Sequence, residues 1–589
     1  MGAPESSTPS SDKLDASVQI LDAGSTNSNL GPVPVRKFNA MRTLKSLGSK
    51  DAWLGDYNYG SLFIPNMPWS KTKRELPFYG VNDQLPYLLM IILGLQHALA
   101  MVGGLVVPPL LLGGGAGANL GPEVQQYLIS GSLIWCAIGT VVQVSRVRIW
   151  GTKYYIGTGL ISVTGTSFAF ANVALQYLAQ SYANGTCPTG PNGVRLPCPK
   201  EYGAIIGTTT LTGILALCLA FVPPKIIRKV FPPLVTGTMI VFMGASLVTA
   251  GVNNWAGGSG PCQTDHTLKC ITGSQSHYWG SAQYLGLGFS CMAMIVICEI
   301  FGSAFFKSAA VFMGLLTGMI IAAATGYFDQ KAIKAAPGGT FLWLHTFPLG
   351  IRGQLVLPLL ATWCVSVAET IGNITASSDV SRLEITGEVF ESRVQGGILA
   401  DAISATLAGL ATVPALTTFA QNAGVIALTR NASLQSGYMC ALFLFLMGVI
   451  GKFGAVFVAC PPSVIGGFTT FLFGSVAVAG VRVLAYAKWS RRDRFIATPA
   501  FAFGLASLCV PNWFDYIFTY HGDNKGLKGL IEAVVLVVAE PYLISALIAA
   551  ILNCSLPTDM EEDEPVQSEE ERKTWNQPAS LVDRPAPTV

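Results

Sequence analysis

The sequence predicts an all-α polytopic membrane protein, and three observations support this class. Of its 589 residues, 51% are hydrophobic and only 12% are charged, whereas about a quarter of the residues of a soluble domain are charged. The mean hydropathy is +0.49, and apolar segments of about 20 residues, the length of a membrane-spanning helix, recur along the chain. The 63 glycines fit the same class, because small residues allow membrane helices to pack closely.

Fourteen apolar segments are expected between residues 87 and 553. They are 87–112, 125–145, 152–175, 204–222, 233–252, 282–304, 309–326, 353–373, 396–412, 414–430, 434–452, 458–482, 495–512 and 528–553. Each half would then hold seven, an odd number, so the second half would be inserted upside down, as in the inverted repeats of many carriers. We therefore divide the chain into an N-terminal region (1–80), a first repeat (81–326), a second repeat (353–554) and an acidic tail (555–589).

Basic residues in the short loops predict the orientation. Those at 225–229, at Lys307, at Arg382 and Arg393 and at 488–494 fall on one side if the chain starts in the cytosol and crosses fourteen times. Both termini would then be cytosolic. The loops 176–203 and 253–281 would lie outside, and they contain the glycosylation sequon at Asn184 and four cysteines.

These four cysteines are Cys187 and Cys198 in one loop and Cys262 and Cys270 in the other. An oxidising face favours one disulfide within each loop, with free thiols as the open alternative. A zinc site is disfavoured, because no pair has the CxxC spacing.

Two of the expected segments are too polar and too interrupted for ordinary spanning helices. One is 414–430, which begins at Pro414 and contains Gln421, Asn422 and Gly424; the other is 151–168, rich in Gly and Thr. Irregular backbone at membrane depth is tolerated where protein covers it or where it lines a cavity. We predict a short extended stretch followed by a helix in each, with the two helix N-termini facing each other and attracting electron-rich ligand atoms. The alternative is a helix-packing face with small and polar residues.

Ionisable side chains within apolar segments are costly and therefore indicate function. The candidates are Glu369, Asp401 and His97, with Glu299 and Glu540 as rivals. Glu369 suits a carboxylate that accepts N–H donors from a planar heterocycle or exchanges a coupling proton, the alternative being a pair with a neighbouring helix. Asp401 lies near the cytosolic end of its segment, where capping a helix or pinning a loop is a real alternative.

The remaining candidates surround these acids. Gln421 offers a carbonyl and an NH₂ group, Asn422 adds a second amide, and Gly424 permits close approach of a ligand. Phe168, preceded by Ser167, is placed to stack on an aromatic ligand or, alternatively, to pack in the core. Thr429 and Arg430 close the run with a hydroxyl and a fixed positive charge.

The pattern Gln421-Asn422-x-Gly424-x-x-x-x-Thr429-Arg430 closely resembles the signature of the nucleobase-ascorbate transporters, a family of purine and pyrimidine carriers that includes the fungal uric acid-xanthine permeases. Gln96-His97, Glu369 and Asp401 also fall where that family places them, and the resemblance extends from about residue 80 to 555.

The resemblance implies a plasma-membrane symporter that imports uric acid and xanthine with protons. It also implies a core domain that holds the site, a gate domain that moves against it, and a homodimer. Gln96 and His97 would organise the site, Asp401 would support proton linkage, and Thr429 and Arg430 would act in selectivity or gating. Asn373 departs from the family, where most relatives carry Asp, and this loss of a titratable group weakens any proton relay that needs both acids. The acidic tail would be a handle for the endocytic ubiquitination machinery.

Several alternatives stay open. Within carriers, they are other purines, pyrimidines or ascorbate as substrates, or an anion carrier of the same seven-plus-seven architecture. A purine channel and a non-transporting receptor belong to a different class. An enzyme is disfavoured because the sequence shows no nucleophile–base set and no metal-spaced cluster. We expect no cofactor beyond the coupling proton, and no nucleic-acid partner.

Overall fold

The computed structural model describes residues 49–65, 76–190, 193–265, 267–272, 274–419, 421–511, 513–514, 517 and 524–557. The acidic tail and most of the N-terminal region lie outside these residues, and so do the expectations that concern them.

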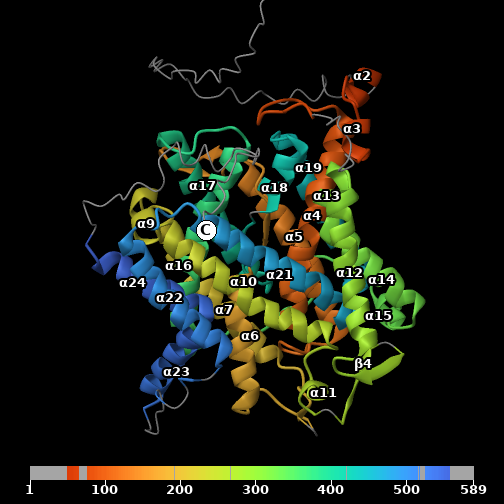
Figure 1. Cartoon of the computed structure of the whole chain (residues 1–589), viewed down its shortest axis with the longest axis vertical. Helices are drawn as coiled ribbons and strands as arrows, with labels where there is room; N and C mark the ends of the chain where they lie inside the picture. Colours follow the sequence, from red (N-terminus) through yellow and green to blue (C-terminus); the bar gives the residue numbers. More distant parts are fainter. Residues whose placement is uncertain are drawn as a thin grey trace, which may run out of the picture.

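The chain folds into helices joined by a few two-stranded sheets (Figure 1). The helices of the first half are α2 (Lys50–Leu54), α3 (Gly60–Phe63), α4 (Tyr87–Gly113), α5 (Pro122–Val144), α6 (Phe168–Ala183), α7 (Pro199–Thr212), α8 (Ile214–Leu219), α9 (Pro224–Val230), α10 (Pro233–Trp255), α11 (Pro261–Thr264), α12 (Ala282–Phe301), α13 (Ala304–Ser308), α14 (Ala310–Ala324) and α15 (Gln330–Ala335). Those of the second half are α16 (Gly353–Val380), α17 (Glu388–Leu410), α18 (Gln421–Thr429), α19 (Leu434–Val449), α20 (Gly451–Ala459), α21 (Pro462–Leu484), α22 (Arg491–Cys509), α23 (Lys525–Ala539) and α24 (Pro541–Ser555).

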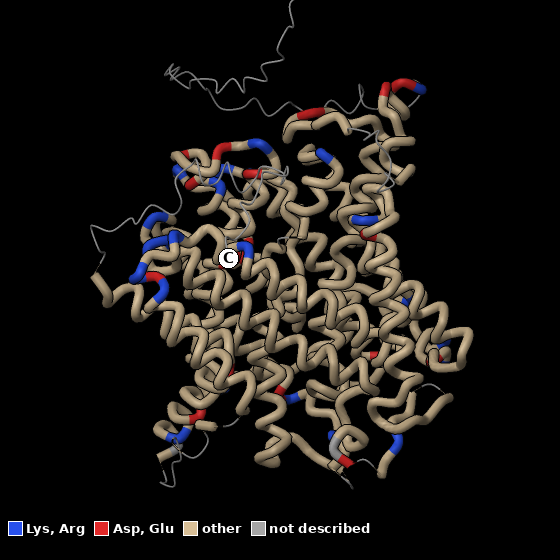
Figure 2. The backbone as a smooth tube through the Cα atoms, viewed as in Figure 1, with Lys and Arg blue, Asp and Glu red and all other residues tan. Residues whose placement is uncertain are grey.

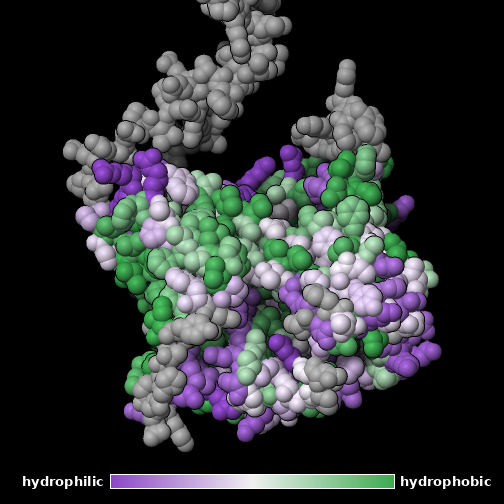
Figure 3. Space-filling view, turned by 60° about the horizontal axis from the view of Figure 1, so that its bottom comes forward, coloured by the Kyte–Doolittle hydropathy of each residue, from purple (hydrophilic) through white to green (hydrophobic). Residues whose placement is uncertain are grey.

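Seven helices in the described chain are long and apolar enough to cross a membrane, or up to nine if two bent helix pairs each count as one span. The bent pairs are α19 with α20, at 73°, and α23 with α24, at 91°. The helices that begin in the segments expected at 152–175 and 414–430 are only α6 and α18, of 16 and 9 residues, because strands occupy the first part of each segment. α6 continues to Ala183, beyond the expected end at 175. Hydrophobic residues cover much of the side of the molecule, and hydrophilic residues gather on the end that Figure 3 turns forward, with smaller groups along the upper edge.

Elements from the N-terminal and C-terminal halves of the chain pack against each other. α10 runs along α21, and β3 (Thr164–Thr166) pairs with β6 (Leu416–Thr418). The other sheets are a hairpin of β1 (Val147–Arg148) with β2 (Tyr155–Ile156) and one of β4 (Lys269–Thr272) with β5 (Gln275–Tyr278). The N-terminal segment packs on the first long helix, since the ring of Trp53 in α2 lies 5.7 Å from that of Tyr87 in α4.

Basic segments that are distant in sequence meet at one end of the molecule. Lys225 Nζ lies 3.3 Å from Glu391 Oε1. Asn553 accepts a hydrogen bond from Arg492 at its side-chain oxygen and donates one to the carbonyl of Lys229. Figure 2 shows more Lys and Arg toward this end than at the opposite one. The prediction placed 225–229, Lys307, Arg382, Arg393 and 488–494 on one side; these contacts agree with it for 225–229, for 488–494 and for the helix that carries Arg393, and they do not involve Lys307 or Arg382.

The opposite end carries α11, β4 and the C-terminal end of α6 (Figure 1). Both expected disulfides are present there, Cys187–Cys198 and Cys262–Cys270. Asn184 is exposed, and its side-chain oxygen accepts hydrogen bonds from the backbone and hydroxyl of Thr186.

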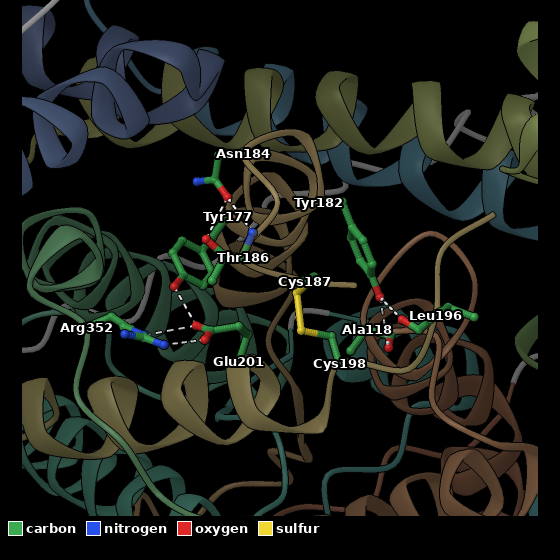
Figure 4. Close-up of a disulfide and its surroundings, with 10 residues drawn as sticks. All are labelled: Ala118, Tyr177, Tyr182, Asn184, Thr186, Cys187, Leu196, Cys198, Glu201 and Arg352. Atoms are coloured by element: carbon green, nitrogen blue, oxygen red, sulfur yellow. Dashed lines mark hydrogen bonds and ion pairs between the residues drawn. A yellow bond between two sulfur atoms is a disulfide. The ribbon is translucent and has the colours of Figure 1, made fainter. Parts of the chain in front are cut away.

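An ion pair between the buried Glu201 and the partly exposed Arg352 lies beside the first disulfide (Figure 4). Arg352, at the start of α16, donates two hydrogen bonds to the carboxylate of Glu201 in α7, one of them from Nε at 2.9 Å. Tyr177 of α6 donates a third at 2.7 Å. The hydrogen bonds to Glu201 raise the pKa of Arg352, so this guanidinium stays charged at physiological pH. The cluster joins three helices at this end.

Candidate functional site

Two helices begin at a pair of short, buried strands. β3 and β6 pair antiparallel, with Gly165 opposite Thr417. α6 begins just after β3, and α18 begins just after β6. Because the first N–H groups of a helix lack partners within it, each strand delivers a helix N-terminus that favours electron-rich atoms.

The close approach of the strands to α4 requires a residue without a side chain. A Cβ atom at Gly165 would lie 2.4 Å from Leu105 of α4 and 2.8 Å from the ring of Phe419. Any larger residue would push β3 away from α4. This contact explains one of the glycines in the interrupted 151–168 segment.

Three phenylalanines meet where α6 begins. The ring of Phe168 lies parallel to that of Phe419, with centroids 6.0 Å apart, and meets Phe473 of α21 edge-on at 5.4 Å. Phe168 is buried. It therefore has packing partners already and joins the strand pair to α21.

Asp401 of α17 fixes β6 in place. Its carboxylate accepts hydrogen bonds from the hydroxyls of Thr370 and Thr418, both at 2.7 Å, and from the backbone N–H of Thr418 at 3.1 Å. Gln143 of α5 donates to Asp401 at 3.4 Å and to the Thr418 hydroxyl at 2.7 Å. All of these partners act as donors toward Asp401, which suits an ionised carboxylate.

Asn373 also helps to hold β6 in place. Its amide nitrogen donates to the carbonyl of Thr418 at 2.7 Å, and Ser366 lies within hydrogen-bonding distance of Thr417 at 3.3 Å. Asn373 thus provides β6 with a hydrogen-bond donor, which the Asp expected from the family resemblance would lack when ionised. The sequence did not single out Gln143, Thr370 or Thr418; a polar residue inside an apolar segment was the available signal for each.

Other polar side chains near the helix starts lack partners within the described chain. Asn422 is fully buried with neither side-chain atom bonded, and the hydroxyl of Ser167 is buried and unbonded. Glu369 of α16 and Gln421 of α18 are half-buried, and neither forms a hydrogen bond or ion pair with the residues that the structure describes. Buried polar groups normally have partners, so this set has unused capacity for a ligand.

Open space lies beside two glycines on the helix faces that carry Glu369 and Gln421. Gly372 and Gly424 follow these two residues by three positions and therefore share their helix faces. A Cβ atom at either glycine would meet nothing within 4 Å, and both glycines are exposed. Since α16 packs against α18, α6 and β6, these two faces border the place where the half-helices begin.

The remaining candidates lie on other elements or farther from the starts of α6 and α18. Gln96 donates to the carbonyl of Ala304 and the hydroxyl of Ser308, so it holds α4 to α13 and makes no direct bond to the other candidates within the described residues. His97 is fully buried, and neither ring nitrogen has a partner there. The rival Glu299 is mostly exposed and lies 3.9 Å from Lys307.

Thr429 and Arg430 form the far end of α18. The Thr429 hydroxyl bonds to Val425 of its own helix. Arg430 ends the helix with a φ of 53° and donates to the carbonyl of Leu76, while its own carbonyl accepts from Tyr79. Arg430 is thus covered by the segment that leads into α4, away from the helix start.

Residues 89–513 match the family described as "Permease family". The chain belongs to this permease family. The permease is 49% identical over 545 residues to the "Purine permease" of Emericella nidulans, covering 91% of this chain and 94% of the relative. It is 44% identical over 552 residues to the "Uric acid-xanthine permease" of the same fungus, covering 93% and 96%.

A bacterial relative is more distant. The permease is 27% identical over 479 residues to the "Xanthine permease XanQ" of Escherichia coli, covering 81% of this chain and 93% of the relative. Membership of the family and the several apolar helices identify the permease as a multi-pass membrane transporter and not an enzyme.

Proposed function

We propose that this permease is a secondary active transporter that imports uric acid and xanthine with protons across the plasma membrane by alternating access. The observation that carries the proposal is the pair of unpartnered side chains, Gln421 and Glu369, on helix faces that border open space beside two helix starts. The names of the fungal relatives support the choice of purines.

The chemistry of these groups fits an oxidised purine. Xanthine and urate present alternating N–H and C=O groups along a ring edge, and the amide of Gln421 offers the complementary acceptor and donor. Glu369 accepts a ring N–H, while Ser167 and Asn422 supply further polar contacts. A site built from such groups rejects ligands that leave its amides unpaired.

The residues that hold β6 in place have a role separate from substrate binding. Asp401, Asn373 and Gln143 hold β6, and with it the start of α18, in register with β3. Gln96 and His97 act on α4, and Thr429 and Arg430 act at the far end of α18 as selectivity or gating residues. Phe168 lines the site from α6 and contacts α21 through Phe473.

The architecture that goes with this function has fourteen segments in a seven-plus-seven inverted repeat. A core domain carries the strand pair, and a gate domain built around α10 and α21 moves against it. Both termini are cytosolic, the protein forms a homodimer, and the acidic tail recruits the endocytic ubiquitination machinery. The pairing of α10 with α21 and the basic contacts at one end support this arrangement.

Uptake in a transporter-deficient yeast tests the proposal. Radiolabelled xanthine should accumulate above the external concentration, more strongly at acidic pH, and uric acid should compete best among a panel of purines, pyrimidines and ascorbate. Flux without saturation would indicate a channel, and binding without accumulation a receptor.

Glu369→Gln separates recognition from coupling. An amide oxygen still accepts one hydrogen bond, so this variant should bind xanthine but fail to concentrate it. Uphill uptake that keeps its pH dependence in Glu369→Gln would place the coupling proton on another residue.

A further inference from the structure

The sharp break between α23 and α24 buries a carboxyl group that has no partner among the described residues. The two helices are bent by 91° relative to each other, and Glu540 is the residue between them. Its side chain is 1% exposed, its Oε1 atom is buried without a hydrogen-bond partner, and it forms no ion pair with any described residue. Burying a charge without compensation is very costly, so such a site favours the neutral carboxylic acid.

Helix capping does not explain this residue. Glu540 occupies the N-cap position of α24, where a carboxylate is stabilised, yet its side chain accepts no hydrogen bond from the first turn. Backbone groups freed by the break are satisfied in other ways. Ser507 of α22 donates to the carbonyls of Val538 and Ala539, and the carbonyl of Glu540 accepts from two amides of α24.

The break is also the place where the chain changes packing partners. α23 packs mainly against α16, which carries Glu369, whereas α24 packs against α10 and α22 (Figure 1). Tyr542, fully buried just after the break, donates to the carbonyl of Ala169 in the first turn of α6 at 3.0 Å. Its hydroxyl also lies 3.3 Å from that of Thr362 in α16. A movement of α10, α22 and α24 relative to α6 and α16 must therefore change this junction.

Few charged groups are available to Glu540 from the elements around it. α6 and α10 contain no Asp, Glu, Lys or Arg, and those of α22 lie in its first turn, about 20 Å along the helix from Ser507. α16 brings Glu369 and, near its other end, Asp379, both of which are acids. On α23 itself, Lys528 and Glu532 lie two or more turns before the break. Since no described residue forms an ion pair with Glu540, a proton is the cation that remains to neutralise it in this conformation.

We propose that Glu540 is a second protonation site of the permease. When Glu540 is neutral, the junction between α23 and α24 packs against α6, and when Glu540 is ionised, this contact is released. The proposal rests on the proposed proton-coupled transport and adds a carboxyl that contacts the moving junction and not the purine. A proton that binds one conformation more tightly than another shifts the equilibrium between them by that difference. Protonation of Glu540 would favour the docked junction, and substrate binding at Gln421 and Glu369 would be linked to it through α6.

Purified permease in liposomes provides the test, with xanthine as substrate and a trapped pH-sensitive dye. The variants are Glu540→Gln, which stays neutral, Glu540→Asp, which keeps an ionisable group, and the matched control Glu532→Gln on the same helix. At zero voltage and a gradient of one pH unit, one coupled proton supports at most about tenfold accumulation.

We expect Glu540→Gln to exchange xanthine across the membrane within about twofold of the unchanged protein. It should lose accumulation, and its exchange should depend on pH less steeply than that of the unchanged protein, because Glu369 keeps its carboxyl group. Glu540→Asp should retain a pH profile, and Glu532→Gln should behave like the unchanged permease. Accumulation and an unaltered pH profile in Glu540→Gln would overturn the proposal.

Two further outcomes are informative. If xanthine drives no proton influx through the unchanged permease, proton-coupled transport itself fails, and the role of Glu540 fails with it. Hydrogen–deuterium exchange of the unchanged permease avoids any variant that does not fold: exchange in 524–557, corrected for the intrinsic pH effect, should rise as pH increases. No such change would overturn the proposal.

Discussion

Gln421 is the residue whose chemistry is most specific to a purine edge. Its amide is half-buried, has no partner in the described chain, and stands at the first position of α18. We expect Gln421→Ala to raise the apparent KM for xanthine about tenfold or more, since two hydrogen bonds of about 0.5–1.5 kcal/mol each would be lost. Initial uptake rates at equal surface abundance measure this. The same substitution at the exposed Gln330 is the control, and an unchanged KM in Gln421→Ala would remove this residue from the site.

Gly424 tests whether the open space beside α18 is where the substrate binds. A Cβ atom there meets nothing within 4 Å, so Gly424→Leu should leave the protein folded while filling the space. Xanthine uptake should fall at least tenfold, whereas the melting temperature in detergent should change little. Gly286→Leu on α12 is matched, because Gly286 is equally open and exposed but lies on another helix. Equal losses in both variants would show that the space beside Gly424 has no special role.

The sequence could name single candidate residues but not their partners. A polar side chain within an apolar segment stands out whatever its surroundings, which is why Gln421, Glu369 and Asp401 could be named. Their partners could not be predicted, because Gln143 and Asp401 are 258 positions apart and meet only in the fold. The same limit applies to Gln96, whose bonds to α13 depend on packing.

At the scale of elements, Asp401 determines the position of a strand. Asp401→Asn would keep one acceptor but direct an NH₂ group at donors from Thr370, Thr418 and Gln143. Hydrogen bonds to a charged group contribute about 1.5–3 kcal/mol each, so we expect a lower melting temperature and weaker uptake of every purine. Thr418→Val, which removes a hydroxyl but keeps the carboxylate, should give the same pattern more mildly.

The pH profile separates this positioning role from proton coupling. If Asp401 mainly holds β6, the residual uptake of Asp401→Asn should keep its dependence on pH, as that of Thr418→Val should. Uptake that loses its pH dependence in Asp401→Asn alone would show that this carboxyl exchanges the coupling proton.

The two interrupted segments show what composition can indicate at this scale. Gly, Thr and Pro in 151–168 and 414–430 indicated that neither segment is a full spanning helix, and the structure has strand followed by helix in both. The antiparallel register, with Thr164 opposite Thr418, depends on contacts between the two halves of the chain, which no local pattern contains.

At the scale of the whole molecule, charge and cysteine placement were more informative than segment boundaries. The basic segments 225–229 and 488–494 meet at one end, and the two disulfides form at the other. Segment number was harder to predict, because breaks at Gly213, Ile450 and Glu540 divide apolar stretches into shorter helices whose combined path depends on tertiary packing.

The ion pair at the disulfide end makes a final prediction about how the whole molecule is held together. The side chain of Glu201 is 2% exposed and that of Arg352 is 36% exposed, so the two partners are not equivalent. Removing the guanidinium leaves the buried carboxylate of Glu201 without a charged partner, whereas removing the carboxylate leaves an arginine whose side chain can turn toward water. We therefore expect Arg352→Gln to destabilise the protein more than Glu201→Gln does, by up to about 3–5 kcal/mol for the loss of one buried partner.

Melting temperatures of the purified variants measure this asymmetry, with both disulfides intact. Tyr177→Phe, which removes one hydrogen bond to Glu201, should cost only about 1 kcal/mol. The KM for xanthine should stay the same in all three variants, because none of the three residues borders the open faces of α16 and α18. A larger decrease in melting temperature for Glu201→Gln than for Arg352→Gln would contradict this expectation, since it would mean that Arg352 cannot reach solvent without its partner.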